Sequence, residues 1–472
     1  MLFHSPEFML TMMLTLLLFW KLPRLRTPIL ALANVLFYAA SGWQYLLLFM
    51  AIATLIYGLS RLIARGVRPR LLLWLGVGVS LLNLGIFKYT AFAAYNLERL
   101  FHLGIDPKAY QLLLPVGISF YSFQLIAYLV DVYKGSLTPS RNLLQFWVFI
   151  AFFGQLIAGP IMRGKDFLPQ IESHEDQGFW SRQFKYGAFL FVIGLLKKVL
   201  LADQVGPLAD GLFARAGSLG ALESWIAAYL FAFQIYFDFS AYSDMAVGIG
   251  HLFGYQLTDN FKTPYLSGNP SEFWRRWHIT LSRWIRDYVY IPLGGSRQGE
   301  VRALLTLLVA MGLSGLWHGA AWTFVIWGLY HGLLAGGHRL WNRHAAARIT
   351  RLPLPNWLIR WGSVFLMFQA TTVGWVFFRA DGVRAALHMV KQMLTFPNLH
   401  LTQMNLLYLG LVGLLFGLHL GEFWFRHQQA RLYEIWTQWL PSPVRALAYT
   451  AVLALIAVMA STKQVSFIYF RF

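Results

Sequence analysis

The fold is decided by the stretch Ser314-Gly315-Leu316-Trp317-His318-Gly319-Ala320-Ala321-Trp322. It lies inside a run from Ala303 to Gly337 that contains no Lys, Arg, Asp or Glu. This run is about 35 residues long, whereas one helical bilayer crossing takes roughly 20 residues. It is therefore too long for one ordinary span and short for two spans with a loop between them. We predict two helical pieces that meet near the small residues of the stretch, with His318 beside the break and below the membrane surface.

The composition indicates a membrane protein. Hydrophobic residues make up 57% of the 472 residues and charged residues only 12%, which excludes an ordinary soluble enzyme. The length allows about ten to twelve spans, beginning with the apolar run from about Phe8 to Trp20. We predict an all-α polytopic protein that forms a single integral membrane domain over residues 1–472. Re-entrant and interfacial amphipathic helices are expected in addition to the spans.

The formal net charge of +19 does not indicate nucleic acid as a partner. The Lys and Arg residues occur in short clusters between apolar runs, a placement that sets membrane topology and contacts the headgroups of membrane lipids. The chain has no cysteine, so disulfides, thiolate catalysis and Cys-ligated metals are excluded. We predict no metal site, and any covalent acyl-enzyme would have to form on Ser, Thr, His or another nucleophile.

Two carboxylates occur inside a second long apolar run, from about Ala221 to Phe253. They are Asp238 and Asp244, in the sequence Tyr-Phe-Asp-Phe-Ser-Ala-Tyr-Ser-Asp. At membrane depth a carboxylate needs a partner or water. Structural pairing and a catalytic role therefore both remain open for these two residues.

An amphipathic pattern covers residues 273–288. At about 100° per residue, the apolar and aromatic side chains fall on one face and the charged ones on the other. We predict an interfacial helix that lies in the membrane plane, with His278 at the edge of the aromatic face. The aromatic face comprises Trp274, Trp277, Leu281, Trp284, Ile285 and Tyr288, and the charged face comprises Arg275, Arg276, Arg283, Arg286 and Asp287.

His318 and His278 suit proton transfer to or from a hydroxyl at membrane depth. The alternative for His318 is a core histidine that is hydrogen-bonded to a neighbouring carbonyl. Acyl transfer from a thioester mainly needs a base for the attacking alcohol and donors for the oxyanion. Ser314, Trp317 and the backbone at Gly319 are candidate donors. The arginines of the charged face are candidates for the phosphates of a bulky acyl carrier.

At these residues the sequence resembles the membrane-bound O-acyltransferases. More narrowly, it resembles their bacterial polysaccharide O-acetyltransferase branch, which includes the membrane subunit of alginate O-acetyltransferase. The resemblance runs from Met1 to at least Leu340 and weakens after about residue 380. The motifs that carry it are Leu114-Pro115-Val116-Gly117-Ile118-Ser119-Phe120-Tyr121, Ala158-Gly159-Pro160, Tyr236-Phe237-Asp238-Phe239-Ser240, Glu272-Phe273-Trp274-Arg275-Arg276-Trp277-His278 and Leu316-Trp317-His318-Gly319.

The resemblance implies a catalytic core over residues 111–340, with spans at 1–110 before it and at 341–472 after it. These would surround a central tunnel in the membrane. It implies that His318 is the essential histidine and His278 a second important one. It also implies acetyl-CoA as a cytoplasmic donor with no bound cofactor, a location in the bacterial inner membrane, and export of acetyl toward an exopolysaccharide of the alginate or cellulose type. A periplasmic or membrane-anchored partner of the SGNH type, together with the exopolysaccharide machinery, would complete the transfer.

On this hypothesis His318 acts as the general base and His278 orients the acceptor or assists proton transfer. Three alternatives remain open, of which the first is D-alanyl or other acyl transfer to a cell-envelope polymer. The others are a polysaccharide or lipid transporter, and a membrane scaffold that recruits the true transferase. The residues expected to line the substrate or donor site are Trp317, Ser314, Trp274, Arg275, Arg276, Arg286, Asp238 and Asp244.

Overall fold

The computed structural model describes residues 3, 5–157, 159–173, 178–297, 299–344, 354–396, 401–460 and 467. These residues form helices and connecting turns, and no β-strand occurs among them. Ala158 of the Ala-Gly-Pro motif lies outside the described residues. The chain divides into two compact units of interleaved segments, Met1–Gly194 with Tyr242–Asp259, and Leu195–Ala241 with Asn260–Phe472. The expectation of one integral domain, with its three parts and its central tunnel, stays a prediction.

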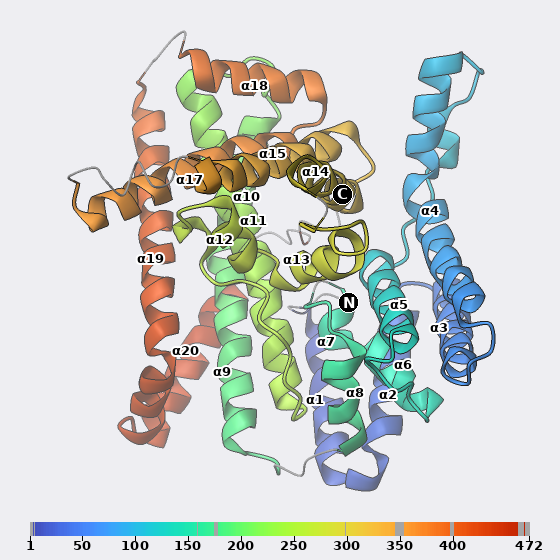
Figure 1. The fold of residues 1–472 in the computed structure, drawn as a ribbon. Coiled ribbons are helices and arrows are strands. Elements are labelled where there is room, and N and C mark those ends of the chain that lie inside the picture. Colours follow the sequence, from blue (N-terminus) through green and yellow to red (C-terminus); the bar gives the residue numbers. More distant parts are fainter. Residues whose placement is uncertain are drawn as a thin grey trace. The chain divides into compact units, whose positions relative to one another are not determined.

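The first unit is built mainly from helices of the N-terminal half. In it α3 and α4 run side by side (Figure 1), and α6 and α7 are separated by a break at Phe152. The helices are α1 (Pro6–Lys21), η1 (Pro23–Leu25), α2 (Arg26–Ala39), α3 (Trp43–Ala64), α4 (Pro69–Phe101), η2 (Pro107–Tyr110), α5 (Ile118–Tyr133), α6 (Leu143–Ala151), α7 (Phe153–Leu156), α8 (Gly164–Ser173) and most of α9 (Arg182–Leu196).

The second unit carries both candidate histidines. The long helix α11 (Ala221–Leu252) begins in this unit and ends in the first. The other helices are η3 (Lys197–Ala202, π-helical), α10 (Asp203–Phe213), η4 (Pro264–Leu266), α12 (Pro270–Arg276), α13 (Ile279–Ile285), η5 (Arg286–Tyr290, π-helical), α14 (Glu300–His318), α15 (Trp322–His344), α17 (Asn356–Arg379), α18 (Val383–Thr395), α19 (Gln403–Gln438) and α20 (Ser442–Ala460).

Five of the described helices are long and apolar enough to cross a membrane, namely α3, α4, α14, α17 and α19. A sixth crossing is possible if α1 and the η1–α2 segment, which meet at 118°, form one broken span. Two further apolar helical segments among the described residues, α5 and Ser442–Leu455 of α20, are shorter than a bilayer crossing. The all-α polytopic membrane fold is confirmed, although fewer helices meet the criterion for a full span than the ten to twelve that the length suggested.

The predicted break in the decisive stretch is confirmed. Helix α14 ends at His318, and α15 begins at Trp322. The two helices pack directly on each other, because a Cβ on Gly315 would overlap the carbonyl oxygen of Phe324 and a Cβ on Gly328 would overlap that of Met311. Only glycine at these two positions lets the two backbones approach so closely. The crossing fixes His318 against the first turns of α15.

The prediction of one interfacial helix over residues 273–288 is wrong. The chain forms two short helices, α12 and α13, that are separated at Trp277 and His278. His278 has φ 41° and ψ 55°, a left-handed conformation that interrupts helical hydrogen bonding. Nearby backbone bonds replace the lost ones: the N–H of Ile279 donates to the carbonyl of Asn260 at 3.0 Å, and that of Lys262 donates to the carbonyl of Arg276 at 2.9 Å.

Candidate functional site

The two candidate histidines lie next to each other in the second unit. The ring centroids of His278 and His318 are 6.3 Å apart. Trp317 contacts both rings, at 6.0 Å from His278 and 5.0 Å from His318. His278 is fully buried and His318 is 3% exposed. Two helix ends far apart in sequence thus bring two imidazoles together in a buried aromatic environment.

Asn260 determines the tautomer of His278. Its Oδ1 accepts from the backbone N–H of Thr280 at 3.1 Å and from the Thr280 hydroxyl at 2.9 Å. Because a backbone N–H can only donate, the oxygen of this amide must face this side. The same Oδ1 is 3.2 Å from Nδ1 of His278, so Nδ1 carries the proton. Burial lowers the pKa of His278 to about 3, and the ring is therefore neutral at pH 7, with its acceptor lone pair on Nε2.

Aromatic rings from three other helices hold the pair in place. Phe239 of α11 lies 4.8 Å from His278, edge to face. Trp327 of α15 and Phe378 of α17 lie 5.1 Å and 5.3 Å from His318. Such ring contacts bury apolar surface and also fix the orientation of the side chains. The sequence pattern did not single out Trp327 or Phe378, since ring contacts between separate helices leave no local periodic signal.

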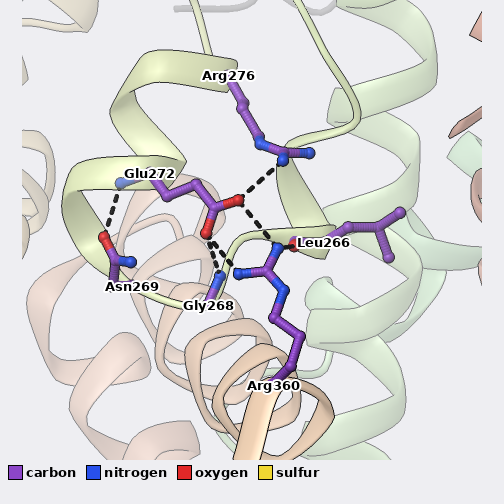
Figure 2. Close-up of polar contacts among 6 residues, drawn as sticks. All are labelled: Leu266, Gly268, Asn269, Glu272, Arg276 and Arg360. Atoms are coloured by element: carbon purple, nitrogen blue, oxygen red, sulfur yellow. Dashed lines mark hydrogen bonds and ion pairs between the residues drawn. The ribbon is translucent and has the colours of Figure 1, made fainter. Parts of the chain in front are cut away.

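Helix α12 is anchored through Glu272 (Figure 2). Its carboxylate accepts from Arg360 of α17 at 2.8 Å and 2.9 Å and from the backbone N–H of Gly268 at 2.8 Å. Arg276, one turn along α12, pairs with it at 2.8 Å. Asn269 caps the helix by accepting from the N–H of Glu272 at 2.8 Å. This cluster fixes the short helix that precedes His278.

The Glu272 cluster gives a pH-dependent stability. Burial alone would raise the pKa of Glu272, but hydrogen bonds from Arg360 and Gly268 and the two guanidinium charges lower it from 4.5 to about 2. A carboxylate whose pKa is lower in the folded than in the unfolded state stabilises the fold at any pH above its unfolded-state pKa. This stabilisation is lost as the pH falls from the unfolded-state pKa toward the folded-state pKa. We expect the melting temperature of Glu272→Gln to lie below that of the wild type by a constant amount above about pH 5, with the difference shrinking between pH 4.5 and about 2.

Thermal unfolding of the two proteins in one detergent, across this pH range, measures the effect. Thr395→Val, which removes an exposed hydroxyl that donates to the carbonyl of Lys391 within α18, serves as the pH-insensitive control. A difference between wild type and Glu272→Gln that stays constant down to pH 2 would show that folding does not lower the pKa of this carboxylate.

A cavity of about 340 Å³ lies within the second unit, between α12, α13, η5, α14 and α15. It brings together Trp274, Ser314 and Arg286 from the expected set and adds Arg339 of α15. Ser314 is one turn before His318 on α14. The cavity wall is mostly apolar, and its polar residues include two arginines, Trp274, Tyr290 and the serines Ser271, Ser282 and Ser314.

Other residues of the expected set are engaged elsewhere. The Asp238 carboxylate pairs with buried Lys198 at 2.9 Å. Arg286 lines the cavity but is 59% exposed and already pairs with Asp287 at 2.6 Å. Arg275 is exposed, and Asp244 belongs to the part of α11 in the first unit. The expected backbone donor at Gly319 is turned to the carbonyl of Gly315, in a long bond of 3.4 Å. The roles of these residues toward a substrate stay predictions.

Comparisons with known proteins address the family. The family model of MBOAT, the membrane-bound O-acyltransferase family, matches residues 16–378, a range that contains both histidines and ends at Phe378. The probable alginate O-acetylase of Azotobacter vinelandii is 40% identical over 388 residues, covering 81% of this chain and 75% of the relative. The peptidoglycan O-acetyltransferase of Helicobacter pylori is 36% identical over 403 residues, covering 80% and 75%. The teichoic acid D-alanyltransferase of Streptococcus thermophilus is 27% identical over 282 residues, covering 56% and 68%.

The predicted resemblance is therefore confirmed over a range that contains the paired histidines. The transporter and scaffold alternatives give way to an enzyme, and the protein is a multi-pass O-acyltransferase. The family model matches most of the chain, and relatives that are 36–40% identical cover about 80% of it. The chain therefore belongs to the membrane-bound O-acyltransferase family.

Proposed function

We propose that the protein takes an acetyl group from acetyl-CoA and transfers it toward hydroxyls of an exopolysaccharide of the alginate or cellulose type. The observation that carries this proposal is the buried pair His278 and His318, with rings 6.3 Å apart beside Trp317. The names of two relatives above 35% identity, a probable alginate O-acetylase and a peptidoglycan O-acetyltransferase, support a polysaccharide acceptor.

In the proposed reaction His318 acts as the general base. It takes the proton of the attacking hydroxyl as the hydroxyl oxygen bonds to the thioester carbonyl carbon. The carbon–sulfur bond then breaks, and the CoA thiolate leaves and takes up the proton. This role requires a neutral imidazole. His278, with Nδ1–H held by Asn260, would present its Nε2 as a second acceptor that orients the hydroxyl.

The cavity beside Ser314 is the proposed donor site. Its arginines, Arg286 and Arg339, suit the phosphates of CoA, and its apolar wall suits the pantetheine arm. Because Ser314 precedes His318 by one turn of α14, an arm that enters this cavity would approach the candidate base. We place the donor on the cytoplasmic side of the bacterial inner membrane. A periplasmic or membrane-anchored partner of the SGNH type would receive the acetyl group and pass it to the polymer.

The test is transfer of label from [14C]acetyl-CoA by the purified protein in nanodiscs, with an alginate oligosaccharide as acceptor, in the presence and absence of such a partner. Release of CoA together with labelled oligosaccharide is the expected result. A protein that transfers D-alanine from a thioester carrier and leaves acetyl-CoA untouched would instead support the activity named for the teichoic acid relatives.

The tautomer argument predicts a large effect at Asn260. Asn260→Leu removes the acceptor that holds Nδ1–H of His278 and the backbone of Thr280. We expect kcat for acetyl transfer to fall about 10²-fold, as for other small misplacements of a reacting group. Thr280→Val, which removes the hydroxyl bond to the same oxygen but keeps the backbone N–H bond to it, is the matched control and should lose much less. Equal losses in the two variants would mean that Asn260 acts on the loop and not on His278.

A further inference from the structure

A third histidine lies in a separate cluster of polar aromatic side chains. His331 of α15 is fully buried. Its ring centroid is 5.0 Å from Trp327 and 5.3 Å from Trp274, and these two indoles are 5.9 Å apart. Phe273 stacks on the imidazole at 5.8 Å, with an interplanar angle of 9°. The three nitrogen-bearing rings are therefore in mutual contact.

Their nitrogen atoms lack the partners that buried polar atoms normally have. Within the part of the chain that the structure describes, neither Nδ1 nor Nε2 of His331 has a hydrogen-bond partner, and neither does Nε1 of Trp274 or of Trp327. Each such atom costs free energy in a folded protein unless something satisfies it. If packing alone were needed here, Phe would fill the same space without this cost. Four such atoms on three touching rings make this cluster a candidate for binding polar atoms of a ligand.

The cluster adjoins the site on two sides. Trp327 has His331 on one side and His318 on another, at 5.0 Å and 5.1 Å. Trp274 lines the 340 Å³ cavity together with Ser314. On α17, Gly374 faces the imidazole, and a Cβ built there would lie 2.9 Å from Nε2 of His331. A substrate in the cavity and a group near His318 both have this cluster as a neighbour.

The chemistry of the cluster defines the ligand. An indole N–H only donates, and a neutral imidazole offers one donor and one acceptor. We propose that His331, Trp274 and Trp327 bind a neutral oxygen of a substrate, either a carbonyl of the pantetheine thioester arm or a hydroxyl of the acceptor sugar. This proposal rests on the proposed acetyl transfer and adds a binding role for a third histidine. His331 is thus a substrate-binding residue and does not take the proton of the reaction.

The test compares His331→Phe with His331→Gln in the full-length protein in nanodiscs. Phe keeps the aromatic packing and removes both nitrogens, whereas Gln keeps a hydrogen-bonding group near the position of Nε2. His338→Phe, on the same helix and bonded to Asn342, is the matched control. The readouts are the melting temperature, KM for acetyl-CoA and for an alginate oligosaccharide, and calorimetric binding of CoA and of the oligosaccharide.

We expect His331→Phe to melt at the wild-type temperature or above, and to raise KM about tenfold, the effect of one lost hydrogen bond to a neutral group. A rise for acetyl-CoA assigns the oxygen to the donor, and a rise for the oligosaccharide assigns it to the acceptor. His331→Gln should recover most of the loss. A His331→Phe variant with both KM values and both affinities unchanged would overturn the proposal and leave His331 a packed core residue.

If His331→Phe fails to fold, the same KM values and affinities are measured for Gly374→Ala. The added methyl group would crowd Nε2 of His331, while the imidazole itself stays in place. If the wild type transfers no acetyl group, the proposed function fails. The two calorimetric affinities need no turnover, so they still determine whether His331 contributes to binding.

Discussion

Replacing His318 with alanine is expected to reduce acetyl transfer about 10²- to 10⁴-fold, the range that a positioned general base supplies. The imidazole ends α14, is 3% exposed, and is held by Trp317, Trp327 and Phe378. No backbone or solvent group can replace a base in such a place. The measurement is release of CoA from acetyl-CoA with acceptor and partner in excess, under single-turnover conditions so that product release does not mask the step.

Two controls separate a chemical role from a structural one. His318→Gln keeps the hydrogen-bonding capacity and approximate size but cannot act as a base, so it should be as inactive as alanine while melting close to the wild type. His338→Ala, on the same hairpin, should stay active. A folded His318→Gln protein with wild-type turnover would contradict the assignment of His318 as the base.

The largest expected loss of stability comes from Lys198. Its side chain is fully buried on the π-helical turn η3 and pairs with Asp203 at 2.6 Å and with Asp238 at 2.9 Å. Lys198→Met keeps the volume and removes the cation from the buried carboxylate of Asp238 and the half-buried carboxylate of Asp203. Removing one partner of a buried ion pair costs about 3–5 kcal/mol, so we expect a much lower free energy of unfolding, measured by denaturant titration in detergent.

Two further variants test this explanation. Arg343→Met removes one partner of the exposed pair with Glu300, whose arginine is 62% exposed, and should cost under about 1 kcal/mol. Adding Asp238→Asn to Lys198→Met removes one of the stranded charges and should recover part of the loss. A double variant less stable than Lys198→Met alone would show that charge pairing is not the reason for the effect. Because Phe239, next to Asp238, packs on His278, activity should fall together with stability in Lys198→Met.

The helix break at His318 could be predicted from the sequence because it follows from the length of the charge-free run around it. A charge-free run too long for one span and too short for two, with glycines in its middle, leaves few alternatives. The need for a partner at Asp238 was predicted for the same kind of reason. Its identity was not, since Lys198 is 40 positions away and the pairing depends on a π-helical turn that has no periodic signature.

The break at His278 shows the limit of periodicity. The 100° pattern over residues 273–288 continues through it, because two short helices in sequence keep nearly the same faces buried. What interrupts the helix is the distant segment at Asn260, whose backbone and side chain take over the hydrogen bonds near His278. A contact between residues 18 positions apart in a loop cannot be inferred from one-dimensional patterns. The same holds for the proposed role of His331, which rests on ring nitrogens that have no hydrogen-bond partner among the described residues.

The glycine crossing of α14 and α15 also limits how the enzyme can move. Where Gly315 and Gly328 meet backbone to backbone, neither helix can slide or roll without collision, because packed interiors respond in discrete steps and not by continuous deformation. The hairpin therefore moves as one rigid body that carries His318, Trp327 and His331 together. Opening and closing of the cavity during a catalytic cycle would have to come from its other walls, α12, α13 and η5, and these short elements are where we expect variants that change turnover without altering the chemical step.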